Sequence, residues 1–227
     1  MPNVQTKRST PSQKHKSHTN LNGSTNGSAS VAGQRRFTVA EYYQMAEVGL
    51  LRPDERTELL EGEIIVMSPQ GSKHAAGGSR TGDIFRALLG TRVIVREQYP
   101  IHLDDESEPE PDVVIALPDE NYYEDHHPTP EEILLVLEVS DSSLEIDRVR
   151  KQRLYAKAGI RQYCLLNIQT HELEDYRQPS ADGYRSKQTY ARTEAFTLAA
   201  FPALQVLVAD LLPKRERLIK NRRRKAS

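Results

Sequence analysis

A glutamate follows a run of apolar residues in the middle of the chain. The apolar residues 133–137 lead directly into Glu138, and a continuous run of this kind predicts a strand buried on both faces. A buried carboxylate is costly unless another group compensates its charge. In the next segment, helical periodicity places Lys151 on an inward face together with Asp147 and Tyr155. A carboxylate at a strand end and a lysine on the inner face of the following helix indicate a functional site.

Length and composition favour one domain with small appendages. A chain of 227 residues can bury one good-sized core. Cys164 is the only cysteine, so an intrachain disulfide is excluded and a cytoplasmic location is expected. No apolar run approaches the roughly 18–20 residues that a membrane span needs, so no membrane partner is expected.

The net charge of −1 hides an uneven distribution. Residues 1–36 carry six Lys or Arg and no acid, and residues 213–227 carry eight against a single glutamate. The body between them, 37–212, holds 17 basic and 31 acidic residues. Contact with a polyanion would therefore depend on the tails or on local patches, although the tails could equally be solubilising extensions.

These patterns divide the chain into three parts. Residues 1–36 are rich in Ser, Thr, Asn, Gln, Gly and Lys and are predicted to be a disordered basic tail. Residues 37–212 are predicted to form the folded domain, and 213–227 a basic C-terminal tail.

The folded part mixes helices and strands without regular alternation. Thr38 and Glu41 predict a capping box for a first helix, and a hairpin is expected to turn at Glu61-Gly62. The other expected elements are a helix at 74–89, strands at 92–103 and 111–117, a buried strand ending at 140, a helix at 143–158, and strands at 161–168, 172–177 and 184–190, followed by an apolar segment at 203–211. This pattern indicates an α+β fold, or α/β with a mixed sheet.

Several motifs in this order resemble a known family. Pro111-Asp112, a buried strand and Glu138-Val139-Ser140 have the spacing of the PD-(D/E)XK nuclease signature, with serine at the lysine position. The strings ELLEGEIIVMSP, EPDVVIAL, LVLEVSDSS and GIRQYCLLN, with His74 and the run from Asp147 to Tyr155, resemble the restriction-endonuclease-like Uma-two family, which is abundant in cyanobacteria. The resemblance covers residues 37–212.

The resemblance implies a restriction-endonuclease-like αβββαβ core, with an extra N-terminal helix and β-hairpin, and metal-dependent cleavage of DNA. Asp112 and Glu138 would be metal ligands, with the Val139 carbonyl as a further ligand. Two carboxylates can hold a hard Mg²⁺ or Mn²⁺ ion while leaving coordinated waters in place. The ion would lower the pKa of a bound water, and a nearby lysine would stabilise charge on the phosphate.

Ser140 departs from the signature because a hydroxyl cannot replace an ammonium group. Lys151, facing inward from the next helix, is the expected substitute and is predicted to be catalytic with Asp112 and Glu138. The alternative is an ordinary i,i−4 ion pair between Lys151 and Asp147 on a partly solvated face.

Other residues are weaker candidates for the same site. Asp112 could merely cap its strand, but the buried strand that follows favours a ligand role. His74 could face the metal or the phosphate, or only cap its helix. Glu58 could add a carboxylate, or pair with a neighbouring arginine. Tyr155 could serve as a packing residue with a bonded hydroxyl, and Gln98 could contact substrate.

Two functions of different classes remain open on the sequence. The first is a metal-dependent DNA endonuclease. The second is a catalytically impaired protein of the same fold that binds nucleic acid or a protein partner, which the acidic body and Ser140 favour. The sequence also leaves open whether the protein is a homodimer.

Overall fold

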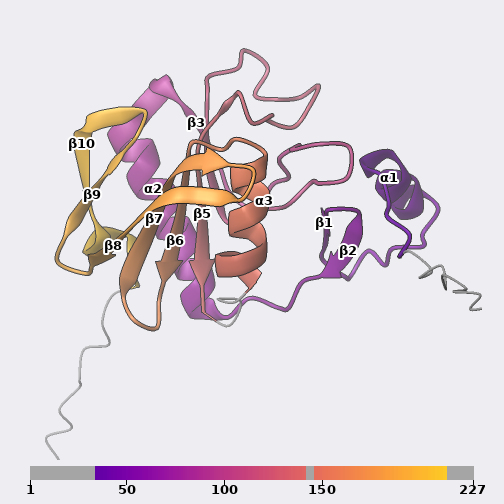
Figure 1. Cartoon of the computed structure of the whole chain (residues 1–227), viewed down its shortest axis with the longest axis horizontal. Helices are drawn as coiled ribbons and strands as arrows, with labels where there is room; N and C mark the ends of the chain where they lie inside the picture. Colours follow the sequence, from indigo (N-terminus) through magenta and orange to yellow (C-terminus); the bar gives the residue numbers. More distant parts are fainter. Residues whose placement is uncertain (1–33, 142–145, 214–227) are drawn as a thin grey trace, which may run out of the picture. The chain divides into compact units, whose positions relative to one another are not determined.

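The apolar segments of the sequence become neighbouring strands of one mixed sheet of six strands, in the order β3-β4-β5-β6-β7-β8 (Figure 1). The computed structural model describes residues 34–141 and 146–213, and those from Arg35 onward belong to one compact unit. The strands are β1 (Thr57–Leu60), β2 (Glu63–Val66), β3 (Ile94–Arg96), β4 (Val113–Ala116), β5 (Ile133–Ser140), β6 (Gln162–Asn167), β7 (Glu172–Ser180), β8 (Gly183–Ala191), β9 (Ala195–Leu198) and β10 (Phe201–Leu207). The helices are α1 (Val39–Glu47), α2 (Ser72–Leu89), α3 (Gln152–Lys157) and α4 (Val208–Leu211), with a 3₁₀ turn at Gly90–Arg92 and a π-helical turn at Ile146–Lys151.

The register of β4 against β5 fixes the position of two carboxylates. The two strands are antiparallel, and Val113 lies opposite Leu137. The start of β4 and the end of β5 therefore share one edge of the sheet. Asp112 precedes β4 by one residue and Glu138 follows Leu137, so the two acids are neighbours across the strand pair.

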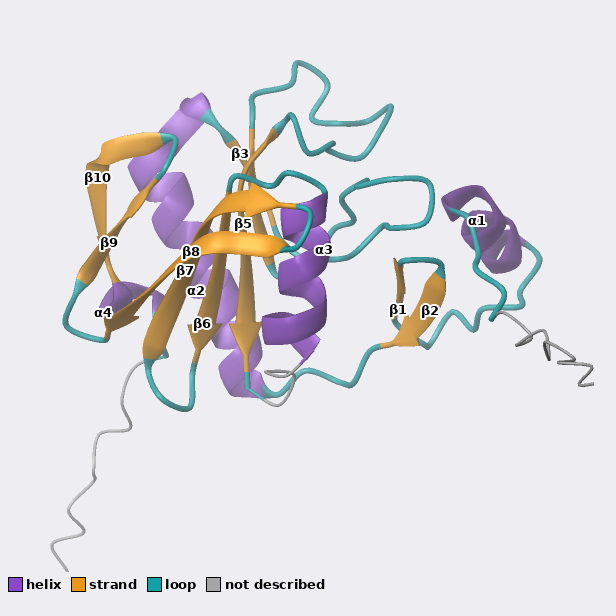
Figure 2. Ribbon diagram, viewed as in Figure 1, coloured by secondary structure: helices purple, strands orange, loops and turns teal. Residues whose placement is uncertain are grey.

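Apolar side chains cover both faces of the sheet, and Figure 2 shows helices α2 and α3 on opposite faces of it. Because successive strand residues point to opposite faces, Leu137 and Val139 of β5 pack with α2, α4 and the β9-β10 hairpin. Val136 packs on the other side, in the layer that contains Leu154 and Tyr155 of α3. Glu138 has the same parity as Val136, so its side chain points toward α3.

Glycines on α2 allow the helix to approach the sheet closely. A Cβ atom on Gly77 would lie 3.0 Å from Cγ1 of Val139, which is tighter than an ordinary contact. Glycine disfavours helix by propensity, but Gly77 and Gly78 are buried inside α2, which begins at Ser72. Tertiary packing therefore overrides propensity here.

The predicted hairpin and helix cap are confirmed. β1 and β2 pair in antiparallel fashion around Glu61 and Gly62, whose φ angles of 49° and 74° are those of a type I′ turn. The Thr38 side chain accepts a hydrogen bond from the Glu41 backbone N–H, and the Glu41 side chain accepts one from the Thr38 N–H.

Two expected elements differ from the structure, and one strand was not expected. The strand expected at 92–103 is shorter, because a 3₁₀ turn occupies Gly90–Arg92 and β3 ends before Gln98, which has a φ of +56°. The helix expected at 143–158 is π-helical over Ile146–Lys151, and residues 143–145 lie outside the described part. Strand β9 was not expected, and it pairs with β10 in a separate hairpin.

The fold class is mixed α/β with a mixed central sheet, as the sequence indicated: β5 is antiparallel to β4 and parallel to β6. The tails predicted for 1–36 and 213–227 lie largely outside the described residues, and the predicted disorder of 1–36 stays a prediction. Among the described residues, no helix combines the length and apolarity required to cross a bilayer.

Adjacent leucines at the end of α2 provide a test of this packing. Leu89 is 2% exposed in the α2-side core, whereas Leu88 is 38% exposed. Leu89→Ala should lower the free energy of unfolding by about 2–5 kcal/mol because it leaves a cavity. Leu88→Ala should change it by about 0.5 kcal/mol. Urea unfolding measures both, and equal effects of the two substitutions would contradict the packing described here.

Candidate functional site

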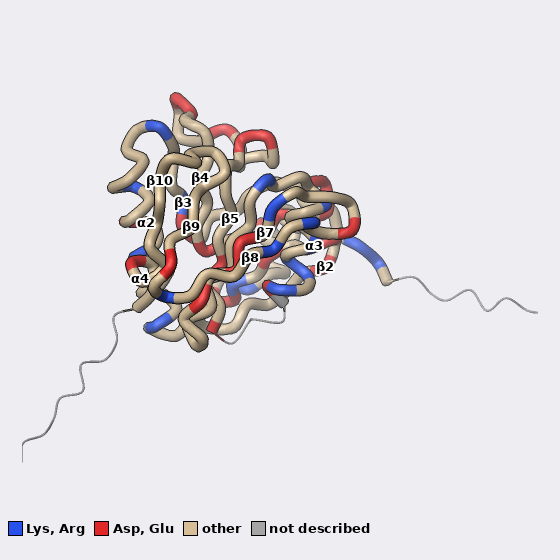
Figure 3. Tube along the Cα trace, turned by 60° about the vertical axis from the view of Figure 1, so that its left-hand side comes forward, with Lys and Arg blue, Asp and Glu red and all other residues tan. Residues whose placement is uncertain are grey.

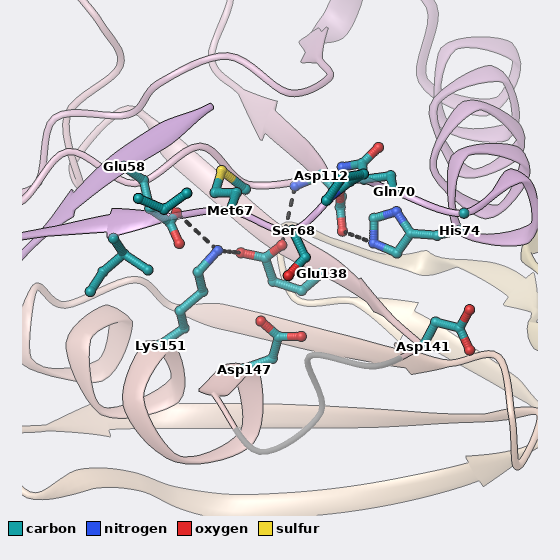
Figure 4. A pocket seen from close by; sticks show the side chains of 14 residues that line it. Glu58, Met67, Ser68, Gln70, His74, Asp112, Glu138, Asp141, Asp147 and Lys151 are labelled. Carbon is teal, nitrogen blue, oxygen red and sulfur yellow. Dashed lines mark hydrogen bonds and ion pairs between the residues drawn. The ribbon is translucent and has the colours of Figure 1, made fainter. Parts of the chain in front are cut away.

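A cavity of about 200 Å³ lies at the sheet edge where β4 begins and β5 ends. Side chains from five segments converge on it (Figure 4). Its ionisable lining residues are Glu58, His74, Asp112, Glu138, Asp141, Asp147 and Lys151. Five carboxylates thus face the cavity with one lysine and one histidine, which makes it an acidic site.

Backbone N–H groups at the two strand ends donate hydrogen bonds to the carboxylates of Asp112 and Glu138. The backbone N–H of Asp112 donates to Oε2 of Glu138 at 3.3 Å, and the N–H of Val139 donates to Oδ2 of Asp112 at 2.8 Å. Both carboxylates are buried, at 6% and 3% exposure. The strand pairing therefore places the two carboxylates next to each other.

Lys151 is the counter-ion of this acidic group. Its Nζ lies 3.0 Å from Oε1 of Glu138 and 3.0 Å from Oε2 of Glu58, and the residue is 4% exposed. The π-helical turn ends at Lys151, which directs its side chain from the start of α3 back toward the end of β5. The partly solvated i,i−4 pair considered for Lys151 is therefore wrong.

Tyr155 supports the same carboxylate from one turn further along. Its hydroxyl donates to Oε1 of Glu138 at 2.8 Å, and its ring is fully buried in the α3-side layer. Burial, first of all, and the nearby negative charges raise the pKa of Tyr155, so its hydroxyl stays protonated. Tyr155 is thus a packing residue that also donates a hydrogen bond to Glu138.

His74 holds the other carboxylate. Its Nε2 lies 3.1 Å from Oδ2 of Asp112. Burial alone would lower the pKa of His74, but the hydrogen bond and the charge of Asp112 outweigh it, so the pKa is raised. The N-cap of α2 is Gly71 without a side-chain bond, so the capping role considered for His74 is wrong.

The burial of Glu138 changes its protonation. Loss of solvation raises the pKa of Glu138 to about 8, and the neighbouring carboxylates add to the rise while Lys151 opposes it. The raised pKa of Glu138 therefore comes chiefly from the loss of solvation, which the charge of Lys151 offsets only in part.

The structure brings the predicted site residues together. Glu58, His74, Asp112, Glu138, Asp147 and Lys151 line the one cavity, with Tyr155 directly behind Glu138. Glu58 pairs with Lys151, while Arg52 and Arg56 pair with Asp54 and Glu110, so the arginine partner considered for Glu58 is wrong. The roles assigned to these residues, including the Val139 carbonyl, stay predictions.

Ser140, at the lysine position of the signature, makes no side-chain contact that replaces an ammonium. Its Oγ is buried and has no hydrogen-bond partner in the described part of the chain. The positive charge next to Glu138 comes instead from Lys151, eleven positions later in the sequence.

Two lining residues escaped the sequence analysis. Gln70 precedes the first turn of α2, and Asp141 directly follows β5. Gln70 lies four residues before His74 and Asp141 directly follows Ser140, and these positions were the available signal. Gln98, considered as a substrate contact, is not among the lining residues and donates instead to Gln70.

The donor set fits a hard divalent cation. The described residues contain no group of three His, Cys, Asp or Glu side chains arranged as a preformed metal cage. Mg²⁺ usually needs no such cage, because it keeps several waters and binds through one or two carboxylates. The neighbouring carboxylates of Asp112 and Glu138, in a cavity with excess negative charge, match that chemistry.

Comparisons with known proteins identify the class. The chain belongs to the family described as "Uma2: Putative restriction endonuclease", which matches residues 39–210. A solved structure, the "putative nuclease belonging to DUF820 from Anabaena variabilis ATCC 29413", matches with a TM-score of 0.60 and 17% identity, covering 77% of this chain and 97% of that chain. At this identity the likeness shows the fold, which is restriction-endonuclease-like. No curated protein matches.

The raised pKa of Glu138 predicts how stability depends on pH. Between its ordinary value of 4.5 and about 8, the folded protein holds a proton that the unfolded chain has lost. The contribution of Glu138 to stability is therefore present below pH 4.5 and is lost as the pH rises toward 8. Glu138→Gln should remove this dependence.

Urea unfolding in EDTA at pH 6.0 and 7.5 checks the expectation. The wild type should lose about 1–2 kcal/mol more than Glu138→Gln over this interval. Glu124→Gln, at an exposed glutamate, is the matched control and should follow the wild type. Parallel curves for the wild type and Glu138→Gln would contradict the raised pKa.

Proposed function

We propose that this protein is an endonuclease that hydrolyses phosphodiester bonds of DNA with Mg²⁺ or Mn²⁺ as cofactor. The observation that supports this most directly is the position of Lys151. Its ammonium lies 3.0 Å from Glu138, in the cavity that Asp112 also lines. Two carboxylates and a lysine of the nuclease signature are thus combined, although the lysine comes from a helix rather than from the strand.

Asp112 and Glu138 would hold the ion, with the Val139 carbonyl as a third protein ligand. A divalent ion bound there supplies polarisation of a phosphoryl oxygen and a bound water with a lowered pKa. The backbone hydrogen bonds between the two strand ends keep both carboxylates in place before substrate arrives.

Lys151 would stabilise the negative charge that develops on the phosphate. Burial lowers the pKa of Lys151, but the charges of Glu138 and Glu58 outweigh that effect and raise it, so the amine stays protonated. A fixed positive charge in a site with little water is worth more than the same charge in bulk solvent.

His74, Tyr155, Glu58 and Asp147 would have supporting roles. His74 donates to Asp112 and Tyr155 donates to Glu138, so each of the two carboxylates accepts a hydrogen bond from one of these supporting residues. Such partners orient a ligand and tune its basicity. Glu58 and Asp147 add negative charge around Lys151 and keep it protonated.

The surface of α3 offers cations for a polyanionic substrate. Arg153 and Lys157 are exposed on α3, and Figure 3 shows further Lys and Arg residues on the neighbouring strand β8. The folded body as a whole is acidic, so a phosphate backbone would be attracted to local groups of exposed cations such as these. This supports DNA as the substrate, and we place the protein in the cytoplasm.

One observation keeps a second function in view. Lys151 is held between two carboxylates, and Ser140 cannot supply a further cation. A protein of this fold that binds nucleic acid or a partner without cleaving would have the same arrangement. Cleavage assays separate the two functions.

Purified variants should lose cleavage of DNA in Mg²⁺ or Mn²⁺. Asp112→Ala and Glu138→Ala should fall to background, and Lys151→Ala should lose about 10²–10³-fold in rate because it removes one charge-stabilising group. Arg52→Ala is the control at a basic side chain that is 67% exposed and does not line the cavity, and it should cleave like the wild type.

Single-turnover cleavage of supercoiled, linear and single-stranded DNA measures these rates. If Lys151→Ala cleaves like the wild type, the assignment of Lys151 is wrong. Binding of DNA without cleavage by the wild type would favour the second function.

Metal binding should also raise the stability of the folded protein. At a concentration of 100 times its Kd, Mn²⁺ should add about 2.7 kcal/mol to the free energy of unfolding, seen as a higher melting temperature. Asp112→Asn should abolish this response because it removes a charged ligand. Asp83→Asn, at a carboxylate that is 80% exposed, should keep it. A full response of Asp112→Asn to Mn²⁺ would show that Asp112 is not a ligand.

A further inference from the structure

Two glutamines connect the wall of the cavity to Asp112. Gln70 lines the cavity, and its Nε2 lies 3.4 Å from Oδ1 of Asp112. Gln98 lies behind it and donates from its own Nε2 to Oε1 of Gln70 at 2.7 Å. The three side chains form a chain of two hydrogen bonds that ends at a predicted metal ligand.

The chemistry of the groups determines which group donates in each of these two hydrogen bonds. An ionised carboxylate only accepts hydrogen bonds, so the amide of Gln70 must present its NH₂ to Asp112. Its carbonyl oxygen then faces Gln98, which must donate. Gln98 therefore determines the orientation of the Gln70 amide, and Gln70 in turn contacts Asp112.

The backbone holds Gln98 in an unusual conformation for this purpose. Gln98 has a φ of +56°, and its N–H donates to the carbonyls of Pro111 and Asp112 at 3.1 and 3.3 Å. A residue other than glycine in the left-handed region is strained, and such strain is frequent at functional sites. In this conformation the Gln98 N–H bonds to the backbone at Asp112, the residue that its side chain contacts through Gln70.

The hydrogen bonds of Asp112 show what the two glutamines control. Oδ2 accepts from the Val139 N–H at 2.8 Å and lies 3.1 Å from Nε2 of His74. Oδ1 accepts a single hydrogen bond among the described residues, the one from Gln70. A carboxylate oxygen has two lone pairs, so one lone pair of Oδ1 remains available in the cavity.

We propose that Gln70 and Gln98 are positioning residues that fix the rotation of the Asp112 carboxylate and so direct the free lone pair of Oδ1 to a divalent cation. The identity of the cation rests on the proposed nuclease function, whereas the hold on Asp112 does not. Loss of a hydrogen-bond partner of this kind typically weakens metal binding about 10–100-fold.

Gln98→Met tests this role because it keeps the length of the side chain, removes the donor and leaves the cavity lining intact. Gln178→Met is a matched control, since Gln178 is an exposed glutamine with a φ of +61° outside the cavity. Titration with Mn²⁺ should give a Kd about 10-fold or more higher for Gln98→Met and unchanged for Gln178→Met, with equal melting temperatures in EDTA for the two variants.

A double-mutant cycle distinguishes a relay from independent structural effects. If Gln98 acts only through Gln70, the pair Gln70→Met and Gln98→Met together should weaken Mn²⁺ binding no more than Gln70→Met alone. Additive effects would contradict the relay, as would a wild-type Mn²⁺ affinity in Gln98→Met.

The side-chain amide of Gln70 gives a second readout without metal. In ¹H–¹⁵N spectra of the protein in EDTA, its NH₂ signals should be protected from solvent exchange, and Gln98→Met should remove that protection while Gln178→Met preserves it. Unprotected signals in the wild type would overturn the proposal. Protection that depends on Gln98, in a wild type that binds no Mn²⁺, would support the hold on Asp112 and contradict the nuclease function.

Discussion

The interaction on which the site depends is the burial of Glu138 against Lys151. A carboxylate and an ammonium removed from water gain from each other only if their remaining hydrogen-bonding capacity is also satisfied. Here the Tyr155 hydroxyl and the backbone N–H of Asp112 donate hydrogen bonds to Glu138, and Glu58 is a second ion-pair partner of Lys151. The cluster still carries more negative than positive charge, and a cavity with that imbalance is suited to a cation from solution.

This requirement explains why distant segments meet at one sheet edge. Glu138 and Asp112 are fixed by strand pairing, but Glu58 comes from the β1-β2 hairpin and Lys151 from the turn before α3. The hairpin is held to that turn by Arg150, which donates to the Leu60 carbonyl at 2.8 Å. The extra hairpin is therefore part of the site, because it supplies the second carboxylate that keeps Lys151 charged.

The sequence predicted most of this arrangement where local patterns and tertiary demands agree. The apolar run before Glu138 and the inward position of Lys151 predicted that these two residues would share a site. The turn residues Glu61-Gly62 predicted the hairpin, and the capping box predicted α1. The sequence did not predict the short β3, because that strand ends at a left-handed Gln98 whose conformation depends on the backbone of residues 111 and 112. Gln70 was missed for the same reason: its role arises from contacts with residues 28 and 42 positions away.

The lysine of the nuclease signature and Lys151 of this chain lie on different elements. In the signature it follows the second carboxylate by two residues on one strand, so both point to the same face. In this chain that place belongs to Ser140, whose hydroxyl is buried without a partner in the described part. This face of the sheet nevertheless packs against α3. Lys151 reaches it from the helix side, and its Nζ lies 3.0 Å from Oε1 of Glu138. The positive charge beside Glu138 therefore comes from the helix side, and the π-helical turn before α3 is the local structure that places Lys151 there.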